Sequence, residues 1–229
     1  MNTVIHSNKK IAVAVFFATA IVIRYYFAIY KPTFLSPVSD GLLYAVLTGI
    51  GPFIGGVIAV YLLGRKKIYS SFGRSIAKSL ICLACPVLLF CLLDVLNGNS
   101  SFIYTKITIT CLLYAYLEEY GWRGYLQSEL INLRKWYRIS IITILWFVWH
   151  LNFELSTGNF IFLVILFFGT WGIGEIVIKS HSVIACACFH SVINIMQNVD
   201  MNIAVLAVLV FCIILWFWLW YGKCWANLR

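Results

Sequence analysis

Apolar runs of about 20 residues recur along nearly the whole sequence, and they constrain the fold more than any other feature. A run of this length spans the hydrocarbon core of a bilayer as an α-helix. Of the 229 residues, 62% are hydrophobic and 11% are charged, and the mean hydropathy is +0.93. A soluble domain of this size needs a more polar surface. The sequence predicts an all-α, polytopic transmembrane helix bundle, with residues 1–229 forming a single integral-membrane domain.

Eight transmembrane helices fit between the loop signals, among them the Pro-rich KPTFLSPVSDG and the polar NGNSS. The first has a basic flank and no small-residue cleavage site, which favours a retained helix over a signal peptide. The predicted spans are 11–30, 41–63, 79–97, 103–131, 138–154, 159–178, 182–199 and 202–221.

Basic residues occupy every second loop of this arrangement. They precede the first span, lie between the second and third and between the fourth and fifth, and follow the sixth and the eighth, the last at Lys223 and Arg229. By the positive-inside rule, both termini are cytoplasmic. The net charge of +9 then reflects membrane topology, and we expect no nucleic-acid partner.

Eight ionisable residues fall inside the spans, where burial of charge is costly and indicates function. They are Arg24, Asp94, Glu118, Glu119, Arg123, His150, Glu175 and His190. Three have simple interpretations. Arg24 can snorkel to the outer interface among tyrosines, Asp94 adjoins the NGNSS loop, and Glu175 can pair with Lys179 at i,i+4. The eight cysteines, nearly all in apolar spans, are interpreted as small hydrophobes rather than as a redox or metal set.

Four of the remaining polar residues are predicted to lie at a similar depth in the membrane. At 1.5 Å per residue, Glu118 lies about 20 Å from the cytoplasmic end of its span. His150 lies about 16 Å deep, His190 about 12 Å and Asn194 about 18 Å. Because the three helices differ in direction, this agreement predicts one polar site near the middle of the bilayer.

Helical spacing divides the acidic pair. Glu119 and Arg123 are i,i+4 neighbours and can neutralise each other. Glu118 is rotated by about 100° from Glu119, so its carboxylate can face a cavity. The same spacing joins Trp146 to His150 and His190 to Asn194, and Gly121 and Gly124 allow a neighbouring helix to approach closely.

Together these groups form an acid–base set. Glutamate or histidine can take a proton from water, and histidine and asparagine can donate to an oxyanion. No nucleophile-elbow sequence and no HExxH motif is present. Two histidines and a glutamate could still bind zinc, but we expect no cofactor and regard zinc as disfavoured.

Three short motifs resemble those of the CAAX protease and bacteriocin-processing (Abi) family of intramembrane endopeptidases. EEYGWR (118–123) is similar to its EExxxR motif, WFVWH (146–150) to an aromatic residue followed four positions later by histidine, and HSVIN (190–194) to HxxxN. The motif-bearing core spans about 103–199. One departure is Trp146, where phenylalanine is usual.

The resemblance implies a glutamic-type intramembrane protease that acts without a metal. Glu118 and His150 would activate water, His190 and Asn194 would stabilise the oxyanion, and Glu119, Arg123 and Trp146 would support them. The substrate would be a lipidated, leader-bearing or membrane-anchored peptide. The compact chain, in which we find no targeting segment, favours a bacterial plasma membrane.

Two other functions remain open. The first is a non-catalytic bacteriocin self-immunity protein or membrane scaffold of the same fold, which would have less need of Glu118 and His150 together. The second is a proton-coupled transporter with a carboxylate–imidazole relay. No internal repeat supports it, and the polar residues cluster in three spans.

Overall fold

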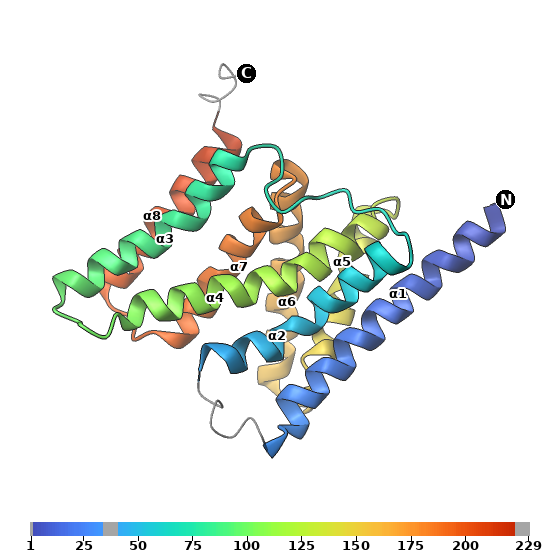
Figure 1. Ribbon diagram of the computed structural model, residues 1–229, viewed down its shortest axis with the longest axis horizontal. Coiled ribbons are helices and arrows are strands. Elements are labelled where there is room, and N and C mark those ends of the chain that lie inside the picture. Colours follow the sequence, from blue (N-terminus) through green and yellow to red (C-terminus); the bar gives the residue numbers. More distant parts are fainter. Residues whose placement is uncertain (1, 34–40, 223–229) are drawn as a thin grey trace.

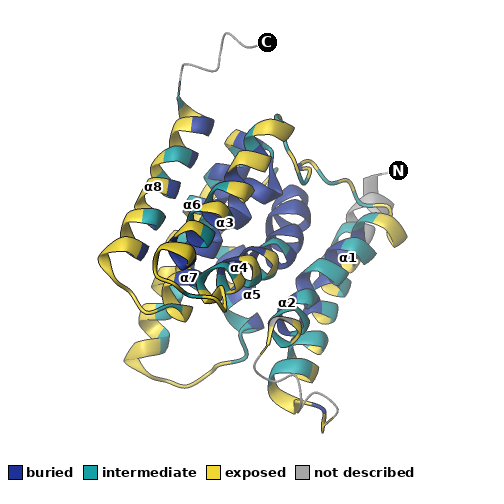
Figure 2. Ribbon diagram, turned by 60° about the vertical axis from the view of Figure 1, so that its left-hand side comes forward, coloured by how far each residue is buried: buried dark blue, intermediate teal, exposed yellow. Residues whose placement is uncertain are grey.

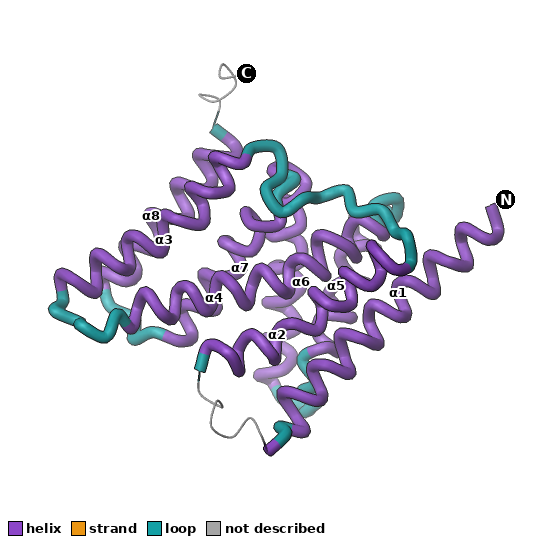
Figure 3. Tube along the Cα trace, in the orientation of Figure 1, coloured by secondary structure: helices purple, strands orange, loops and turns teal. Residues whose placement is uncertain are grey.

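The computed structural model describes residues 2–33 and 41–222, which form a helical bundle (Figure 1). Lys223 and Arg229, part of the predicted basic C-terminal flank, lie outside the described residues. Within the described ranges the regular structure is helical, and Figure 3 shows helices joined by loops and no strand. One isolated β-bridge pairs Ser70 with Ser182.

Eight α-helices are present in the described part of the chain, as predicted. Their bounds are α1 Asn2–Arg24, α2 Leu42–Val57, α3 Ile76–Leu96, α4 Ile103–Glu119, α5 Lys135–Trp149, α6 Thr157–Ser180, α7 Val183–Asn198 and α8 Ile203–Tyr221. Three continue as π-helices: η1 Tyr25–Tyr30 after α1, η3 Ile58–Leu62 after α2, and η4 Tyr120–Gln127 after α4. The all-α fold class is therefore confirmed.

Five segments in the described ranges are long and apolar enough to cross a membrane. They lie in α1 with η1, α2 with η3, α3, α6 and α8. Of the helices that carry the predicted site, α5 and α7 are shorter, with 15 and 16 residues, whereas α4 continues as η4 to Gln127. At 1.5 Å per residue, α5 is only about 22 Å long. The long apolar helices indicate an integral membrane protein.

Helix α4 lies in the middle of the bundle and packs against α2, α3 and α7 (Figure 1). Exposed residues lie on the outer face of α8, whereas buried residues concentrate toward the middle (Figure 2). In a membrane protein such outward apolar surface can face lipid. The central position of α4 places its two glutamates away from that surface.

Asp94 anchors the start of α4. Its carboxylate accepts hydrogen bonds from the backbone N–H groups of Tyr104 and Thr105, at 3.2 and 2.8 Å. The Thr105 hydroxyl and the Asn99 amide also donate to it, both at 2.7 Å. A carboxylate at a helix N-terminus satisfies unpaired N–H groups and opposes the helix dipole. Asp94 thus has the structural setting expected from its place beside the NGNSS loop.

Several basic loops meet at one end of the bundle. Arg65, after η3, forms a two-bond ion pair with Glu129, with N–O distances of 2.6 and 3.0 Å. Lys9 of α1 lies 4.0 Å from the same carboxylate. Contact among these segments agrees with the predicted alternation of loops. Which side of the membrane this end faces stays a prediction.

Glu175 does not pair with Lys179, and that prediction is wrong. Its carboxylate lies 2.8 Å from Nζ of Lys135 at the start of α5. Nζ of Lys179 lies over the ring of Tyr221, at 5.6 Å from its centroid. The i,i+4 pair of Glu175 and Lys179 does not form because α6 packs against α5 and α8, which offer each side chain a partner on another helix.

Candidate active site

The EEYGWR segment contains a change of helix type. Helix α4 ends at Glu119, and η4 continues from Tyr120 with the wider π-helical turn. The predicted span over 103–131 thus contains a change from α-helix to π-helix, and the segment remains helical to Glu129. Such π-bulges occur often at functional sites. The two carboxylates separate at this transition: Glu118 and Glu119 are both buried but have different partners.

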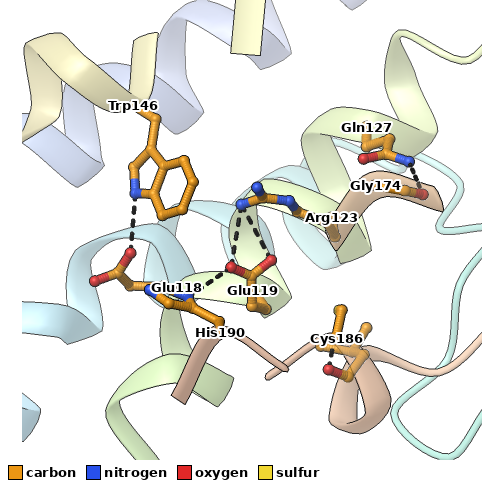
Figure 4. A network of polar contacts seen from close by, with 9 residues as sticks. Glu118, Glu119, Arg123, Gln127, Trp146, Gly174, Cys186 and His190 are labelled. Atoms are coloured by element: carbon orange, nitrogen blue, oxygen red, sulfur yellow. Dashed lines mark hydrogen bonds and ion pairs between the residues drawn. The ribbon is translucent and has the colours of Figure 1, made fainter. Parts of the chain in front are cut away.

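Glu119 is the centre of a buried charge cluster. Nη1 of Arg123 lies 3.1 Å from each of its carboxylate oxygens, which confirms the predicted i,i+4 pair. Nδ1 of His190 on α7 lies 2.7 Å from Oε1 of the same carboxylate. Figure 4 shows both partners converging on Glu119. The carboxylate therefore holds His190 as well as Arg123, and the spacing argument had identified only the arginine.

Trp146 of α5 connects the two glutamates. Its indole N–H donates to Oε2 of Glu118 at 3.0 Å (Figure 4). The guanidinium of Arg123 lies over the same indole, 4.4 Å from the centroid, and the imidazole of His190 meets it edge-on at 5.3 Å. One aromatic side chain thus contacts both carboxylate assemblies. Its ring packs against Arg123 and His190, and its N–H group donates to Glu118.

His150 is the residue that follows α5, which ends at Trp149. The predicted extension of this span to residue 154 is wrong, and His150 sits at the helix terminus instead of its interior. Its Nδ1 lies 2.8 Å from the carbonyl oxygen of Trp146. Because a carbonyl only accepts, Nδ1 carries the proton, and Nε2 of the neutral ring is left as an acceptor.

A cavity of about 1020 Å³ joins the four residues predicted to be catalytic. Glu118, His150, His190 and Asn194 all line it. The amide nitrogen of Asn194 is buried without a hydrogen-bond partner in the structure. The supporting residues Glu119, Arg123 and Trp146 are not part of the lining. The structure therefore brings the four residues to one cavity and, as the helical rotation indicated, places Glu118 in its lining and Glu119 outside it.

The cavity extends to an exposed mouth at one end of the bundle. Gly41, Lys106 and Asn198 are exposed and line it, as does the exposed Gln197. Lys106 and Glu118 are twelve positions apart on α4, so the cavity runs about 18 Å along this helix. This mouth lies at the N-terminal end of α4, whereas Glu129 and the basic loops follow its C-terminal end.

Arg24 is a cavity residue that the sequence interpretation missed. It was expected to snorkel outward, but its Nη1 donates to the carbonyl of Thr48 at 3.1 Å and reaches the hydroxyl of Tyr114 at 3.5 Å. Its guanidinium lies over Trp149, 4.6 Å from the ring centroid. The inward geometry overturns that expectation. No local signal could have revealed it, because the partners come from α2, α4 and α5.

Gly121 places α2 directly against the motif. A Cβ at this position would collide with the backbone carbonyl of Pro52 in α2. The predicted close approach is therefore confirmed at Gly121. At Gly124 a Cβ would meet side-chain atoms of Val183 and Lys67 at 3.4 and 3.5 Å and the Glu119 carbonyl oxygen at 3.8 Å, all ordinary contacts.

Among the described residues, no group of three or more His, Cys, Asp or Glu side chains has the geometry to hold a metal ion. Glu118 is directed to Trp146, and the imidazole of His190 is directed to Glu119. The two histidines and Glu118 line one cavity without converging on a single point as ligands would.

The fold and the site define an integral membrane protein with a buried polar cavity inside a helix bundle. A protein-family model described as type II CAAX prenyl endopeptidase Rce1-like matches residues 100–196. The match confirms the resemblance to the CAAX protease family and spans all seven predicted site residues. A comparison with curated proteins gives no match. The matched family is a protease family, which supports a hydrolase.

Proposed function

We propose that this protein is an intramembrane endopeptidase that hydrolyses a peptide bond of a lipidated, leader-bearing or membrane-anchored peptide. The observation that supports this most is the common lining of one cavity by Glu118, His150, His190 and Asn194. We place the protein in the plasma membrane of a bacterium. We treat residues 1–229 as one domain, because Arg24 and Thr48 line the same cavity although they lie outside the family match.

In the proposed reaction, water in the cavity is activated by Glu118 and His150. The carboxylate of Glu118, oriented by the Trp146 N–H, takes the proton as the water oxygen attacks the carbonyl carbon. The free Nε2 of neutral His150 can accept a hydrogen bond from the same water. The proton then passes to the leaving amine as the C–N bond breaks, which yields a carboxylic acid and an amine.

His190 and Asn194 are assigned to the developing oxyanion. The Glu119 carboxylate accepts from Nδ1 of His190, which directs Nε2 away from Glu119; when Nε2 also carries a proton, it can donate to the oxyanion. The unpaired amide of Asn194 is a second donor in the same cavity. Donors held in place before the reaction stabilise charge that develops in the transition state.

The test is cleavage of candidate membrane peptides by the purified protein in detergent or liposomes. We expect Glu118→Ala and His150→Ala to lose activity, with Glu154→Ala, an exposed loop glutamate, as the control. Cleavage that survives both cavity substitutions would refute the glutamic mechanism. Loss on chelation with recovery on adding zinc would instead support metal-dependent hydrolysis. Absence of cleavage by the wild type on every peptide would favour the immunity or scaffold function.

A further inference from the structure

Arg24 is a cation inside the cavity that the proposed reaction does not use. It lies at the end of α1, outside the residues matched by the family model. It lines the cavity together with Glu118, His150, His190 and Asn194. Its position therefore brings a permanent positive charge into the space where a substrate would lie.

The guanidinium forms no ion pair with a described carboxylate. Within the described residues no carboxylate lies at ion-pair distance from Arg24, and its two hydrogen-bond acceptors are the uncharged Thr48 carbonyl and Tyr114 hydroxyl. Its Nε is buried and has no hydrogen-bond partner. Glu118, the nearby cavity carboxylate, interacts with Arg24 electrostatically but forms its hydrogen bond with Trp146. A half-buried cation with no carboxylate in direct contact is suited to an anion that binds from outside.

The surroundings hold the guanidinium in place rather than leave it mobile. Trp149 lies beneath it, and the indole N–H of Trp149 is itself fixed by the carbonyl of Ala20 at 3.1 Å. The Thr48 carbonyl accepts a hydrogen bond from Nη1 of Arg24. A planar guanidinium fixed in this way matches the geometry of a carboxylate, which it can bind through two parallel N–H groups.

We propose that Arg24 is a specificity residue that binds a carboxylate of the peptide substrate in this cavity, with Lys106 at the mouth adding positive charge along the entry path. The inference rests on the proposed endopeptidase function. Two sources offer the same chemistry: the free C-terminal carboxylate of the peptide and the side chain of an Asp or Glu. Either would fix the position of the peptide relative to Glu118 and so select the bond that is cut.

The test measures binding of three fluorescently labelled peptides that share one short core of Ala, Val and Leu. The first ends in a free carboxylate, the second in an amide, and the third in an amide preceded by one Asp. Binding is followed by fluorescence anisotropy in detergent, with Glu118→Gln protein so that no peptide is consumed. Cleavage of the same peptides by the wild-type protein is measured separately.

We expect the free-acid peptide or the Asp peptide to bind about tenfold or more tightly than the plain amide, since a hydrogen-bonded charge pair is replaced by a neutral contact. Adding Arg24→Gln should remove this preference, and Arg24→Lys should retain part of it. The matched control is Arg138→Gln, because Arg138 is another arginine that donates to backbone carbonyls, those of Ile131 and Leu133, but lies away from the cavity. It should keep the preference.

Preference for the free acid identifies the chain terminus as the source, and preference for the Asp peptide identifies the side chain. Equal binding of all three peptides, no binding, or a preference that survives Arg24→Gln would overturn the inference. If Arg24→Gln does not fold, the wild-type preference and its reduction in Arg24→Lys decide instead. A preference without cleavage would refute the endopeptidase and leave the subsite standing. Cleavage without preference would do the reverse.

Discussion

The indole N–H of Trp146 donates to Glu118 at 3.0 Å, while the face of the same ring lies 4.4 Å from the guanidinium carbon of Arg123. Trp146 therefore supplies two separate contributions, a hydrogen bond and an aromatic surface. The first orients a carboxylate that faces the cavity. The second packs against the arginine that neutralises Glu119.

Substitutions of Trp146 can separate these contributions. Trp146→Phe removes the N–H group and part of the indole bulk but keeps an aromatic ring, so we expect cleavage to fall by about ten- to hundredfold, because one hydrogen bond to a charged group is lost. Trp146→Ala also leaves a cavity beside Arg123, and should lower stability by about 3–5 kcal/mol and abolish cleavage. Kinetics and thermal unfolding in detergent check both. Equal loss of cleavage in the two variants would mean that the hydrogen bond, and not the ring, is decisive.

The buried Glu119–Arg123 pair should show strong coupling. Glu119→Gln leaves the arginine uncompensated and should destabilise the protein by about 3–5 kcal/mol. Adding Arg123→Met removes that charge and should restore much of the stability. Cleavage should not return, because His190 has still lost the carboxylate that holds its Nδ1. Denaturant unfolding and kcat are the measurements, and recovery of kcat in the double variant would contradict the role given to Glu119.

Gly121 and Gly124 form a matched pair for testing close packing. Gly121→Ala would drive a methyl group into the Pro52 backbone, which cannot move as a side chain can, and should cost about 1–3 kcal/mol. Gly124→Ala makes only ordinary contacts and should be neutral or stabilising by up to about 1 kcal/mol. Thermal unfolding of both variants in the same detergent gives the comparison. Equal effects would show that the α2 contact does not limit this position.

His181, in the link between α6 and α7, should make stability depend on pH. Burial, followed by the adjacent Arg74 charge, lowers the pKa of His181 from its ordinary value of 6.5. Nη2 of Arg74 donates to its Nε2 at 2.9 Å, which requires an unprotonated nitrogen there. Below pH 6.5 the unfolded chain takes up a proton that the folded state resists, so stability falls as the pH drops toward the folded pKa.

The measurement for His181 is the unfolding temperature between pH 7.5 and 5. We expect His181→Gln to show a smaller decrease on acidification than the wild type. Because the other histidines are present in both proteins, only the difference between the two proteins is diagnostic. An unchanged difference across this range would rule out His181 as a contributor.

The positive-inside prediction places the cavity mouth on the non-cytoplasmic side. A cysteine introduced at exposed Lys106, beside the mouth, should react with a membrane-impermeant maleimide added to intact cells. A cysteine at exposed Arg134, near the basic end, should react only after lysis. The wild type, whose described cysteines are buried or half-buried, gives the background. The opposite labelling pattern would invert the orientation.

The spans and the motif residues were accessible from sequence for a simple physical reason. Hydropathy and loop signals are local, and the split between Glu118 and Glu119 follows from helical rotation alone. The pairing of His190 with Glu119 was not accessible, because it joins residues 71 positions apart. Arg24 was missed for the same reason. An arginine near a helix end suits both an outward and an inward orientation, and only remote partners decide between them.

Segment 64–75 ties the end of the bundle opposite the mouth. Four backbone hydrogen bonds join it to residues 180–184, where α6 ends and α7 begins. In two of them the Arg74 N–H donates to the Ser180 carbonyl at 3.0 Å and the Val183 N–H donates to the Ser70 carbonyl at 2.9 Å. The Arg65–Glu129 pair adds a further tie at this end. This end is therefore held by backbone bonds between segments far apart in the sequence, whereas the hydrogen bonds of Asp94 at the mouth end join only the successive helices α3 and α4 and their loop. We expect a peptide to enter where the helices separate at the mouth, while the opposite end of the bundle stays closed.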